Sequence, residues 1–195
     1  MPALRWEAGL EIELLLSGIG GQGVQMVGKT LALAAVSEGR NAQLYGEYGG
    51  EMRGGNSLVN VIVGDGPIRA LPIVSAASHA IILNMKFWAE VENRIRTDAF
   101  LVVDKEFAPK LPATFSPTVV PAREIALEAG NAMATGLALL GAFAAATDVV
   151  SIDALIAAMK QQVPSYRQQH VETNSRAILM GAAAAASADL SRSEV

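Results

Sequence analysis

The stretch SGIGGQGVQMVGKT, residues 17–30, most constrains what this chain folds into, because its glycines match two phosphate-binding patterns at once. Gly18 to Gly23 fits G-x-G-x-x-G, the dinucleotide fingerprint, whereas Gly23 to Thr30 fits G-x-x-x-x-G-K-[ST], the Walker A loop. The two patterns put the bound phosphates at different points along the chain. At most one of them describes the loop, and the flanking elements decide between them.

The residues around these glycines predict a strand, a turn and a helix. Glu11 to Ser17 is a short apolar run that ends at the first glycine, and Val24 to Ser37 carries helical spacing until Gly39 ends it. Asn41 to Tyr45 is a candidate second strand. The link before it is short, as expected in a βαβ unit with both strands in one parallel sheet.

A second glycine-rich segment, GEYGGEMRGGNS at residues 46–57, is too polar to belong to the core. The β-rich run from Ser57 to Val63 follows it. The turn at Gly64–Pro67 then leads into Ile68 to Val74, which predicts a hairpin. We therefore expect an antiparallel component in an otherwise parallel sheet.

The rest of the chain alternates strands with helices and then becomes helical. We expect strands at residues 79–83, 100–103 and 118–120, and helices at 87–95, 121–130, from 131 onward, 152–162 and 166–186. No repeat or linker divides the 195 residues. The order predicts a single three-layer α/β/α domain over residues 1–195, with a mostly parallel, partly mixed sheet, a helical C-terminal third and a frayed tail at 188–195.

Charge and composition exclude several classes of function. A net charge of −4 argues against nucleic-acid binding, which needs clustered Lys and Arg. The absence of cysteine excludes disulfides, thiolate-bound zinc and cysteine-held iron–sulfur clusters in this chain. The N-terminus has no basic region typical of a signal peptide, and the longest apolar stretch, residues 132–147, is shorter than the roughly 20 residues of a membrane span. We expect a cytoplasmic protein whose low charge content, 17%, reflects partners that cover part of its surface.

The Walker A interpretation requires the loop to begin where the strand ends, with Lys29 and Thr30 in the first turn of the helix. Here the strand ends by Ser17, and the apolar spacing from Val24 onward puts Lys29 one turn inside the helix. Asp104 ends an apolar strand, as a Walker B aspartate does, but many apolar strands end in this way.

The dinucleotide interpretation places the glycines better, directly between strand and helix, where a helix N-terminus favours an anion. It also needs an acidic residue near the end of the second strand to bind a ribose, and Glu47 stands there. The chain is, however, too short for a second nucleotide-binding half plus a substrate domain. A stand-alone nucleotide-binding protein, of dinucleotide or P-loop type, stays as the alternative function.

Together, the two glycine segments resemble the paired signatures of the gamma subunit, or gamma domain, of 2-oxoacid:acceptor oxidoreductases. This family includes the pyruvate, 2-oxoglutarate, 2-oxoisovalerate, indolepyruvate and phenylglyoxylate enzymes. The resemblance extends over about residues 14–180 and includes the GDGPI turn at residues 64–68, Asn84, and PAREIALEAGNAMATGLALLGA at residues 121–142. Gly50 departs from the pattern, because many members carry proline there in a G-P-E-x-R-G segment.

The resemblance implies a hetero-oligomeric enzyme in which alpha and beta subunits bind thiamine diphosphate with Mg and decarboxylate the 2-oxo acid. Electrons leave through an iron–sulfur subunit to ferredoxin, or through a flavin subunit to NAD, and coenzyme A takes the acyl group. For this chain it implies a gamma subunit with no catalytic residue and no metal of its own, inactive when isolated. The absence of cysteine fits this division of labour.

The residues that the resemblance assigns to coenzyme A (CoA) binding lie in the two glycine segments: Gly18, Gly20, Gly21, Gln22, Gly23, Glu51, Arg53, Gly54, Gly55 and Asn56. The amides of Gly20 to Gly23, at a helix N-terminus, would receive phosphate oxygens. Arg53 would add a bidentate contact to a phosphate or a substrate carboxylate, and Gln22 and Asn56 would hydrogen-bond polar groups.

Purely structural roles compete with each of these assignments. A glycine turn between strand and helix also serves close packing alone, and Glu51 and Arg53 also suit an ion pair between subunits. Lys29 fits a solvated or partner-facing ammonium. His79 and His170 have no second ligand at metal spacing, so we assign both a structural role. A scaffolding subunit with no ligand is therefore the third class of function.

Overall fold

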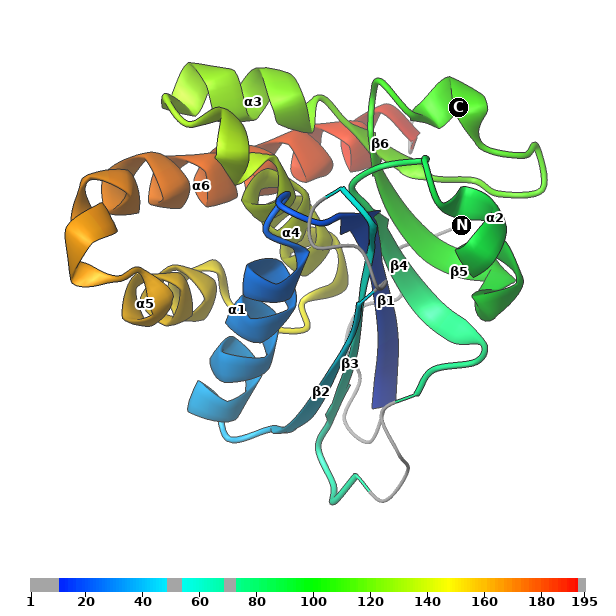
Figure 1. The fold of residues 1–195 in the computed structure, drawn as a ribbon, viewed down its shortest axis with the longest axis horizontal. Helices are drawn as coiled ribbons and strands as arrows, with labels where there is room; N and C mark the ends of the chain where they lie inside the picture. Colours follow the sequence, from blue (N-terminus) through cyan, green and yellow to red (C-terminus); the bar gives the residue numbers. More distant parts are fainter. Residues whose placement is uncertain (1–10, 49–53, 69–72, 193–195) are drawn as a thin grey trace.

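The computed structural model describes residues 11–48, 54–68 and 73–192 (Figure 1). Its middle layer is a six-stranded sheet with the order β2-β3-β1-β4-β5-β6. The strands are β1 (Glu11–Ile19), β2 (Asn41–Tyr48), β3 (Asn56–Gly64), β4 (Ala77–Ile82), β5 (Ile95–Asp104) and β6 (Thr118–Val120). β1, β4, β5 and β6 are parallel, whereas β3 runs antiparallel to both of its neighbours. The expected mixed sheet is confirmed.

Helices cover both faces of this sheet. They are α1 (Val24–Ser37), α2 (Trp88–Val91), α3 (Ala122–Ala129), α4 (Thr135–Thr147), α5 (Ile152–Gln162) and α6 (Val171–Arg192). Short 3₁₀ turns complete the set: η1 (Glu92–Arg94), η2 (Ala108–Lys110), η3 (Ala132–Ala134) and η4 (Ser165–His170). α1, α4, α5 and α6 lie on one side of the sheet and α2 on the other (Figure 1). The three-layer α/β architecture and the helical C-terminal third are confirmed.

Alternation of side chains along the strands divides the core into two parts. Leu14 and Leu16 of β1 join the larger cluster under α1 and α4, whereas Leu15 points to the smaller cluster under α2. β3 is buried on both faces as well, because Val59, Val61 and Val63 join the larger cluster, whereas Leu58 and Ile62 join the smaller one. This double burial explains why its sequence shows no clean alternation.

The antiparallel strand enters the sheet at a place that the sequence did not predict. β1 and β2 run in the same direction, as the βαβ pattern implied, but β3 lies between them and separates them. β2 and β3, on either side of the second glycine segment, form an antiparallel pair. Because β1 and β2 occupy both edges of β3, no edge of β3 is left for the hairpin that we expected after the Gly64–Pro67 turn. The predicted pairing of β3 was wrong for this reason; residues 69–72 of the expected second strand lie outside the described residues.

Element ends also differ from the expected ones. The helix expected at 87–95 is limited to α2 and η1, because Ile95 already begins β5. α6 continues to Arg192, beyond the point where we expected the tail to fray; residues 193–195 lie outside the described part. The boundaries of β6 and α5 match the expected ones.

Two glycines let α4 and α6 pack backbone to backbone. A Cβ atom on Gly141 would overlap the carbonyl group of Ile178, and one on Gly181 would overlap that of Ala138. α4 is buried along most of its length, as expected for the apolar helix. Within the described ranges, no helix combines the length and apolar character that a membrane crossing requires.

The buried histidine of β4 shows how the core excludes charge. His79 is 4% exposed and packs against the rings of Phe100 and Phe143, with ring centroids at 6.2 and 5.8 Å. Its Nδ1 lies 2.8 Å from Ser78 Oγ, whereas its Nε2 is buried with no hydrogen-bond partner in the described part of the chain. Burial, and secondarily the charge of Arg96, lowers the pKa of His79 to about 4. This position fits the structural role assigned from the sequence.

The close crossing of α4 and α6 predicts that Gly141→Ala and Gly181→Ala each lower the free energy of unfolding by about 2 kcal/mol, because backbone must move to admit the methyl group. Urea denaturation measures this change. Gly66→Ala, at an exposed position with open space around the missing Cβ, is the matched control and should shift it by less than about 0.5 kcal/mol. Equal stability of all three variants would mean that the helices do not touch through these glycines.

The pKa of His79 predicts a loss of stability in mild acid. In the unfolded chain His79 is protonated below about pH 6.5, whereas in the folded chain it stays neutral down to about pH 4. The stability therefore falls as the pH falls through this window. A shift of this size corresponds to about 3 kcal/mol. His79→Gln removes the titration, and denaturation curves between pH 7 and 4 should then show a shallower loss than the parent. Parallel pH profiles of parent and variant would contradict the assignment.

Candidate functional site

The chain changes sides of the sheet between β1 and β4. β1 leads into α1 over the larger core cluster, whereas β4 leads into α2 over the smaller one. In open α/β sheets, ligands bind in the crevice that such a change leaves at the carboxyl ends of the strands. The first glycine segment and Asn84, which follows β4, both lie at this point.

The turn after β1 is closed by the side chain of Gln22. The side-chain Oε1 of Gln22 accepts a hydrogen bond from the backbone amide of Ile19 at 2.9 Å. The backbone amide of Gln22 donates to the Ile19 carbonyl at 3.0 Å. Gly21 and Gly23 have φ of 104° and 78°, a region that favours glycine. The turn then delivers the chain into α1 at Val24, with no side-chain cap on the helix.

The expectation that all amides from Gly20 to Gly23 are available to a ligand was wrong for two of them. The Gly20 amide donates to the Gly55 carbonyl at 2.9 Å, and the Gln22 amide donates within the turn. In the described part of the chain, the amides of Gly21 and Gly23 have no partner. The other two amides are used within the fold, one toward the second glycine segment and one within the turn, so half of the predicted donors remain for an anion.

Gly18 differs from the other predicted residues because packing explains it. A Cβ atom there would come within 2.8 Å of Val24 Cγ2 and 3.2 Å of Leu83 Cβ. The residue belongs to β1, where it pairs with Ser57. Gly18 therefore lets the helix start close to the strand, which is the close-packing role weighed from the sequence.

The structure brings the second glycine segment against the first. Besides the bond from the Gly20 amide to Gly55, a Cβ on Gly20 would lie 3.5 Å from the Gly54 amide nitrogen, so the two backbones are in near contact. Gly54 has a φ of 75°. Glu51 and Arg53 lie outside the described residues. The predicted meeting of the two segments thus holds for their described parts.

The side chain of Asn56 makes a hydrogen bond within the chain. Its Nδ2 donates to Glu90 Oε2 at 2.7 Å, and its Oδ1 is buried without a partner among the described residues. Asn56 thus ties the start of β3 to α2, and the ligand contact that we expected stays a prediction. Sequence reasoning missed Glu90 and its neighbour Lys86, which donates from Nζ to the Gly54 carbonyl at 3.0 Å. Their only sequence signal is their place directly after an apolar strand.

The Walker-like GKT residues lie inside α1, as the helical spacing predicted. A Cβ on Gly28 would come within 2.5 Å of Val59 Cγ1, so this glycine lets α1 approach β3. Thr30 is fully buried, and its Oγ1 donates to the Met26 carbonyl and accepts from Gln162 Nε2, both at 2.8 Å. A Walker A threonine must instead face a magnesium ion. The match to that motif is accidental.

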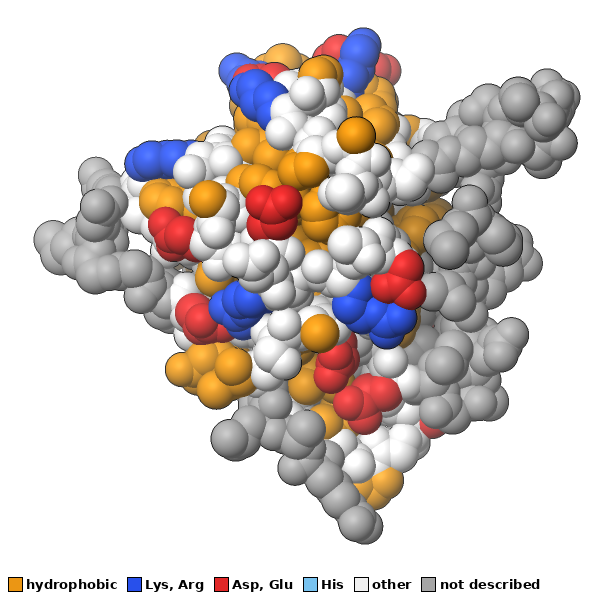
Figure 2. Space-filling view, turned by 90° about the vertical axis from the view of Figure 1, so that its right-hand side faces the viewer, with side chains coloured by type: hydrophobic (Ala, Val, Ile, Leu, Met, Phe, Trp, Pro, Cys, Tyr) orange, Lys and Arg blue, Asp and Glu red, His pale blue; other side chains and the backbone are white. Residues whose placement is uncertain are grey.

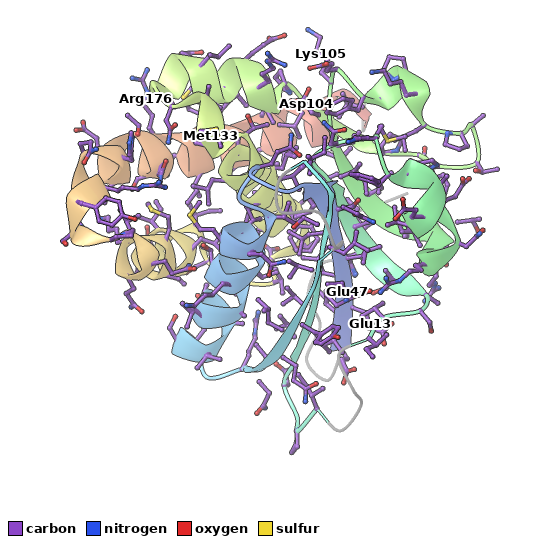
Figure 3. The ribbon with its side chains drawn as sticks, viewed as in Figure 1. Glu13, Glu47, Asp104, Lys105, Met133 and Arg176 are labelled. Atoms are coloured by element: carbon purple, nitrogen blue, oxygen red, sulfur yellow. The ribbon has the colours of Figure 1, made fainter. Side chains whose placement is uncertain are left out.

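Asp104 and Glu47, which the nucleotide motifs would use as a Walker B aspartate and a ribose-binding glutamate, are both hydrogen-bonded within the chain. Asp104 accepts hydrogen bonds from the amides of Glu106 and Arg123, both at 2.8 Å, and so holds the start of α3. Glu47 pairs with Arg94, with Oε1 2.8 Å from Nη2 and Oε2 3.1 Å from Nη1. The hydrogen bond from Arg94 is the main reason why the pKa of Glu47 lies below its usual value. Figure 3 shows Asp104 at the upper edge of the sheet and Glu47 well below it.

A cavity of about 320 Å³ adjoins the first glycine segment. Its lining combines polar and apolar side chains, among them Gln22, Leu83, Asn84, Arg123, Leu127 and Met133. It opens at the carboxyl ends of β4 and β5 and beside the start of α4, the side of the molecule on which Figure 3 labels Met133 and Asp104. Through Gln22, the first glycine segment therefore borders a hollow large enough for part of a small ligand.

Known proteins are similar to this chain in sequence and in fold. The family model described as pyruvate ferredoxin/flavodoxin oxidoreductase matches residues 13–184. The pyruvate synthase subunit PorC of Methanothermobacter thermautotrophicus is 29% identical over 155 residues, with 78% of this chain and 86% of PorC covered. The 2-oxoglutarate synthase subunit KorC of Methanothermobacter marburgensis is 31% identical over 160 residues, with the same shares covered.

Some relatives are much longer than this chain. The ketoisovalerate oxidoreductase subunit VorA of Methanothermobacter thermautotrophicus is 34% identical over 131 residues, which cover 67% of this chain but 27% of VorA. The chain thus spans about a quarter of the length of the VorA subunits that it matches.

Solved structures show the same fold. The gamma subunit of a keto/oxoacid ferredoxin oxidoreductase from Geobacter sulfurreducens superposes with a TM-score of 0.78 at 30% identity, over 92% of this chain and 98% of that one. The 2-oxoglutarate:ferredoxin oxidoreductase from Magnetococcus marinus, with 2-oxoglutarate, coenzyme A and succinyl-CoA bound, gives 0.80 at 18% identity, over 93% and 32%. The second likeness concerns the fold alone. With its family model matched from residue 13 to residue 184, the chain belongs to the pyruvate ferredoxin/flavodoxin oxidoreductase family.

Proposed function

We propose that this chain is the gamma subunit of a thiamine-diphosphate-dependent, CoA-acylating 2-oxoacid oxidoreductase complex. The complex oxidatively decarboxylates a 2-oxo acid to an acyl-CoA and passes the electrons to ferredoxin or another acceptor. The chain acts as a single gamma-type domain that completes the active-site cavity and helps to bind CoA. Support comes from the family membership and from PorC and KorC, which this chain matches over most of their length.

The observation that carries the CoA part of this proposal is the contact between the two glycine segments at the change of sheet side. The bond from the Gly20 amide to Gly55 leaves the amides of Gly21 and Gly23 unpaired within the described residues, next to the N-terminus of α1. A diphosphate group, with several charged oxygens, suits two unpaired amides at a helix N-terminus. The diphosphate of CoA is such a group.

The electron-transfer and decarboxylation chemistry belongs to partner chains in this proposal. A sequence without cysteine cannot ligate an iron–sulfur cluster through thiolates, so an iron–sulfur subunit holds the clusters. Alpha and beta subunits bind thiamine diphosphate, which supplies the carbanion-stabilising chemistry when it is bound. A flavin subunit joins where NAD is the final acceptor. The residues of this chain orient CoA and exclude water from its phosphate end.

Apolar side chains on the surface support the association with partner chains. Val119 of β6, Leu127 of α3 and Met133 of η3 are 40%, 59% and 62% exposed, and the last two border the cavity. On the face drawn in Figure 2, hydrophobic side chains lie in the upper part, with acidic and basic side chains both above and below them. Exposed apolar groups beside a cavity are typical of surfaces that a partner covers.

The stand-alone nucleotide-binding protein is not favoured, because the residues that it needs are engaged elsewhere. Thr30 is buried in a hydrogen-bonded contact with α5, and Glu47 pairs with Arg94. The purified chain should therefore neither hydrolyse ATP nor hold NAD. Micromolar binding of either nucleotide by the isolated chain, measured by calorimetry, would contradict the proposed function.

The role of the free amides is tested by Gly21→Ala in the assembled complex. A side chain at a φ of 104° forces the backbone to rotate and moves the neighbouring amides, so the KM for CoA should rise about tenfold. The KM for the 2-oxo acid should stay unchanged. Gly39→Ala is the matched control, because this glycine has a φ of 81°, equally open surroundings, and a place at the other end of α1.

Steady-state kinetics of both variants decide the question. A higher KM for CoA in Gly21→Ala alone supports the proposed site. If the two variants give the same KM for CoA as the parent in a fully assembled complex, the chain is a scaffold and the CoA role is wrong.

A further inference from the structure

Among the described residues, three hydrogen bonds hold residues 54–56 of the second glycine segment in place. The Gly55 carbonyl accepts from the Gly20 amide at 2.9 Å, the Gly54 carbonyl accepts from Lys86 Nζ at 3.0 Å, and Asn56 Nδ2 donates to Glu90 Oε2 at 2.7 Å. Two of these contacts come from the short stretch after β4. That stretch therefore determines how the second segment sits against the first.

Lys86 is fixed more firmly than most exposed lysines. Its backbone amide donates to Asn84 Oδ1 at 2.9 Å, which closes a turn directly after β4. Its Nζ lies 4.9 Å from the centre of the Phe87 ring and also donates a hydrogen bond to the Gly54 carbonyl. Asn84 in turn lines the cavity beside the first glycine segment. One turn thus connects the cavity wall, the ammonium group and the second segment.

The charge of Lys86 is not neutralised by the described residues. In the ranges 11–48, 54–68 and 73–192, no carboxylate lies within ion-pair distance of its Nζ, whereas Lys105, Arg94, Arg96 and Arg123 each have one. The chain as a whole carries a net charge of −4. Lys86 therefore puts a positive charge at the carboxyl edge of the sheet with no carboxylate paired to it among the described residues, and this charge attracts anions there.

From these contacts we infer that Lys86 is a positioning residue of the proposed CoA site. Its ammonium holds the Gly54–Gly55 backbone against the first glycine segment and presents its positive charge to the phosphate groups bound there. An ammonium group has three donors, so the bond to Gly54 leaves two for phosphate oxygens. The inference rests on the proposed function, because it assigns a residue to the same site.

The test compares Lys86→Met, Lys86→Arg and Lys110→Met in the assembled complex. Lys110 is the matched control, because its Nζ also lies over a neighbouring aromatic ring, at 5.1 Å from the centre of Phe107, on an exposed 3₁₀ turn. Two quantities are measured for each variant: the KM for CoA and the Kd of the resting complex for ADP, by calorimetry. Both are repeated at two salt concentrations.

Lys86→Met should raise the KM for CoA and the Kd for ADP about tenfold, with kcat and the KM for the 2-oxo acid unchanged. It should also flatten the salt dependence of both quantities, because a charge is lost. Lys86→Arg, which keeps the charge and the donors, should stay within about threefold of the parent. Lys110→Met should stay within about twofold.

The outcomes separate this inference from the proposed function. If Gly21→Ala raises the KM for CoA but Lys86→Met does not, the CoA site stands and the role of Lys86 is wrong. If Lys86→Met and Lys86→Arg weaken CoA binding equally, and the KM for CoA and the Kd for ADP keep the salt dependence of the parent, the charge plays no part. The inference is then also wrong. If neither Gly21→Ala nor Lys86→Met changes CoA or ADP binding, the proposed site itself fails.

Discussion

The backbone hydrogen bond from the Gly20 amide to the Gly55 carbonyl continues the pairing of β1 with β3 into the two glycine segments on which the candidate site depends. The bond exists because β3 returns antiparallel beside β1 and starts at Asn56, opposite Ile19. The fold therefore places two loops that are far apart in the sequence at one edge of the sheet. Two amides of the first loop then remain without partners among the described residues, beside the start of a helix.

Local sequence patterns predicted the elements well and their pairing less well. The helix after the glycines and the strand at Thr118–Val120 were predicted with the observed bounds, because spacing and turn residues act over a few positions. The insertion of β3 between β1 and β2 was not, since it depends on contacts between distant segments. A strand buried on both faces carries no signal that says which strands flank it.

The candidate site shows the same limit at the level of single residues. The sequence indicated the two glycine segments, and the described part of the structure brings them together, but it did not indicate the bond between Asn56 and Glu90. Gly28 and Thr30 match a nucleotide motif, yet helix packing accounts for both. Lys86 belongs to no recognised motif, and its contact with the second glycine segment becomes visible only in the structure, where its Nζ donates to the Gly54 carbonyl. Motif letters describe residue types, whereas partners decide what each side chain does.

The proposed function makes one central physical claim: the amides of Gly21 and Gly23, which have no partner among the described residues, bind the phosphate end of CoA. A structure of the assembled complex with CoA bound tests this most directly. The account predicts diphosphate oxygens at about 2.7–3.2 Å from the amide nitrogens of Gly21 and Gly23. CoA bound in the complex with no phosphate contact to residues 18–23 would contradict it.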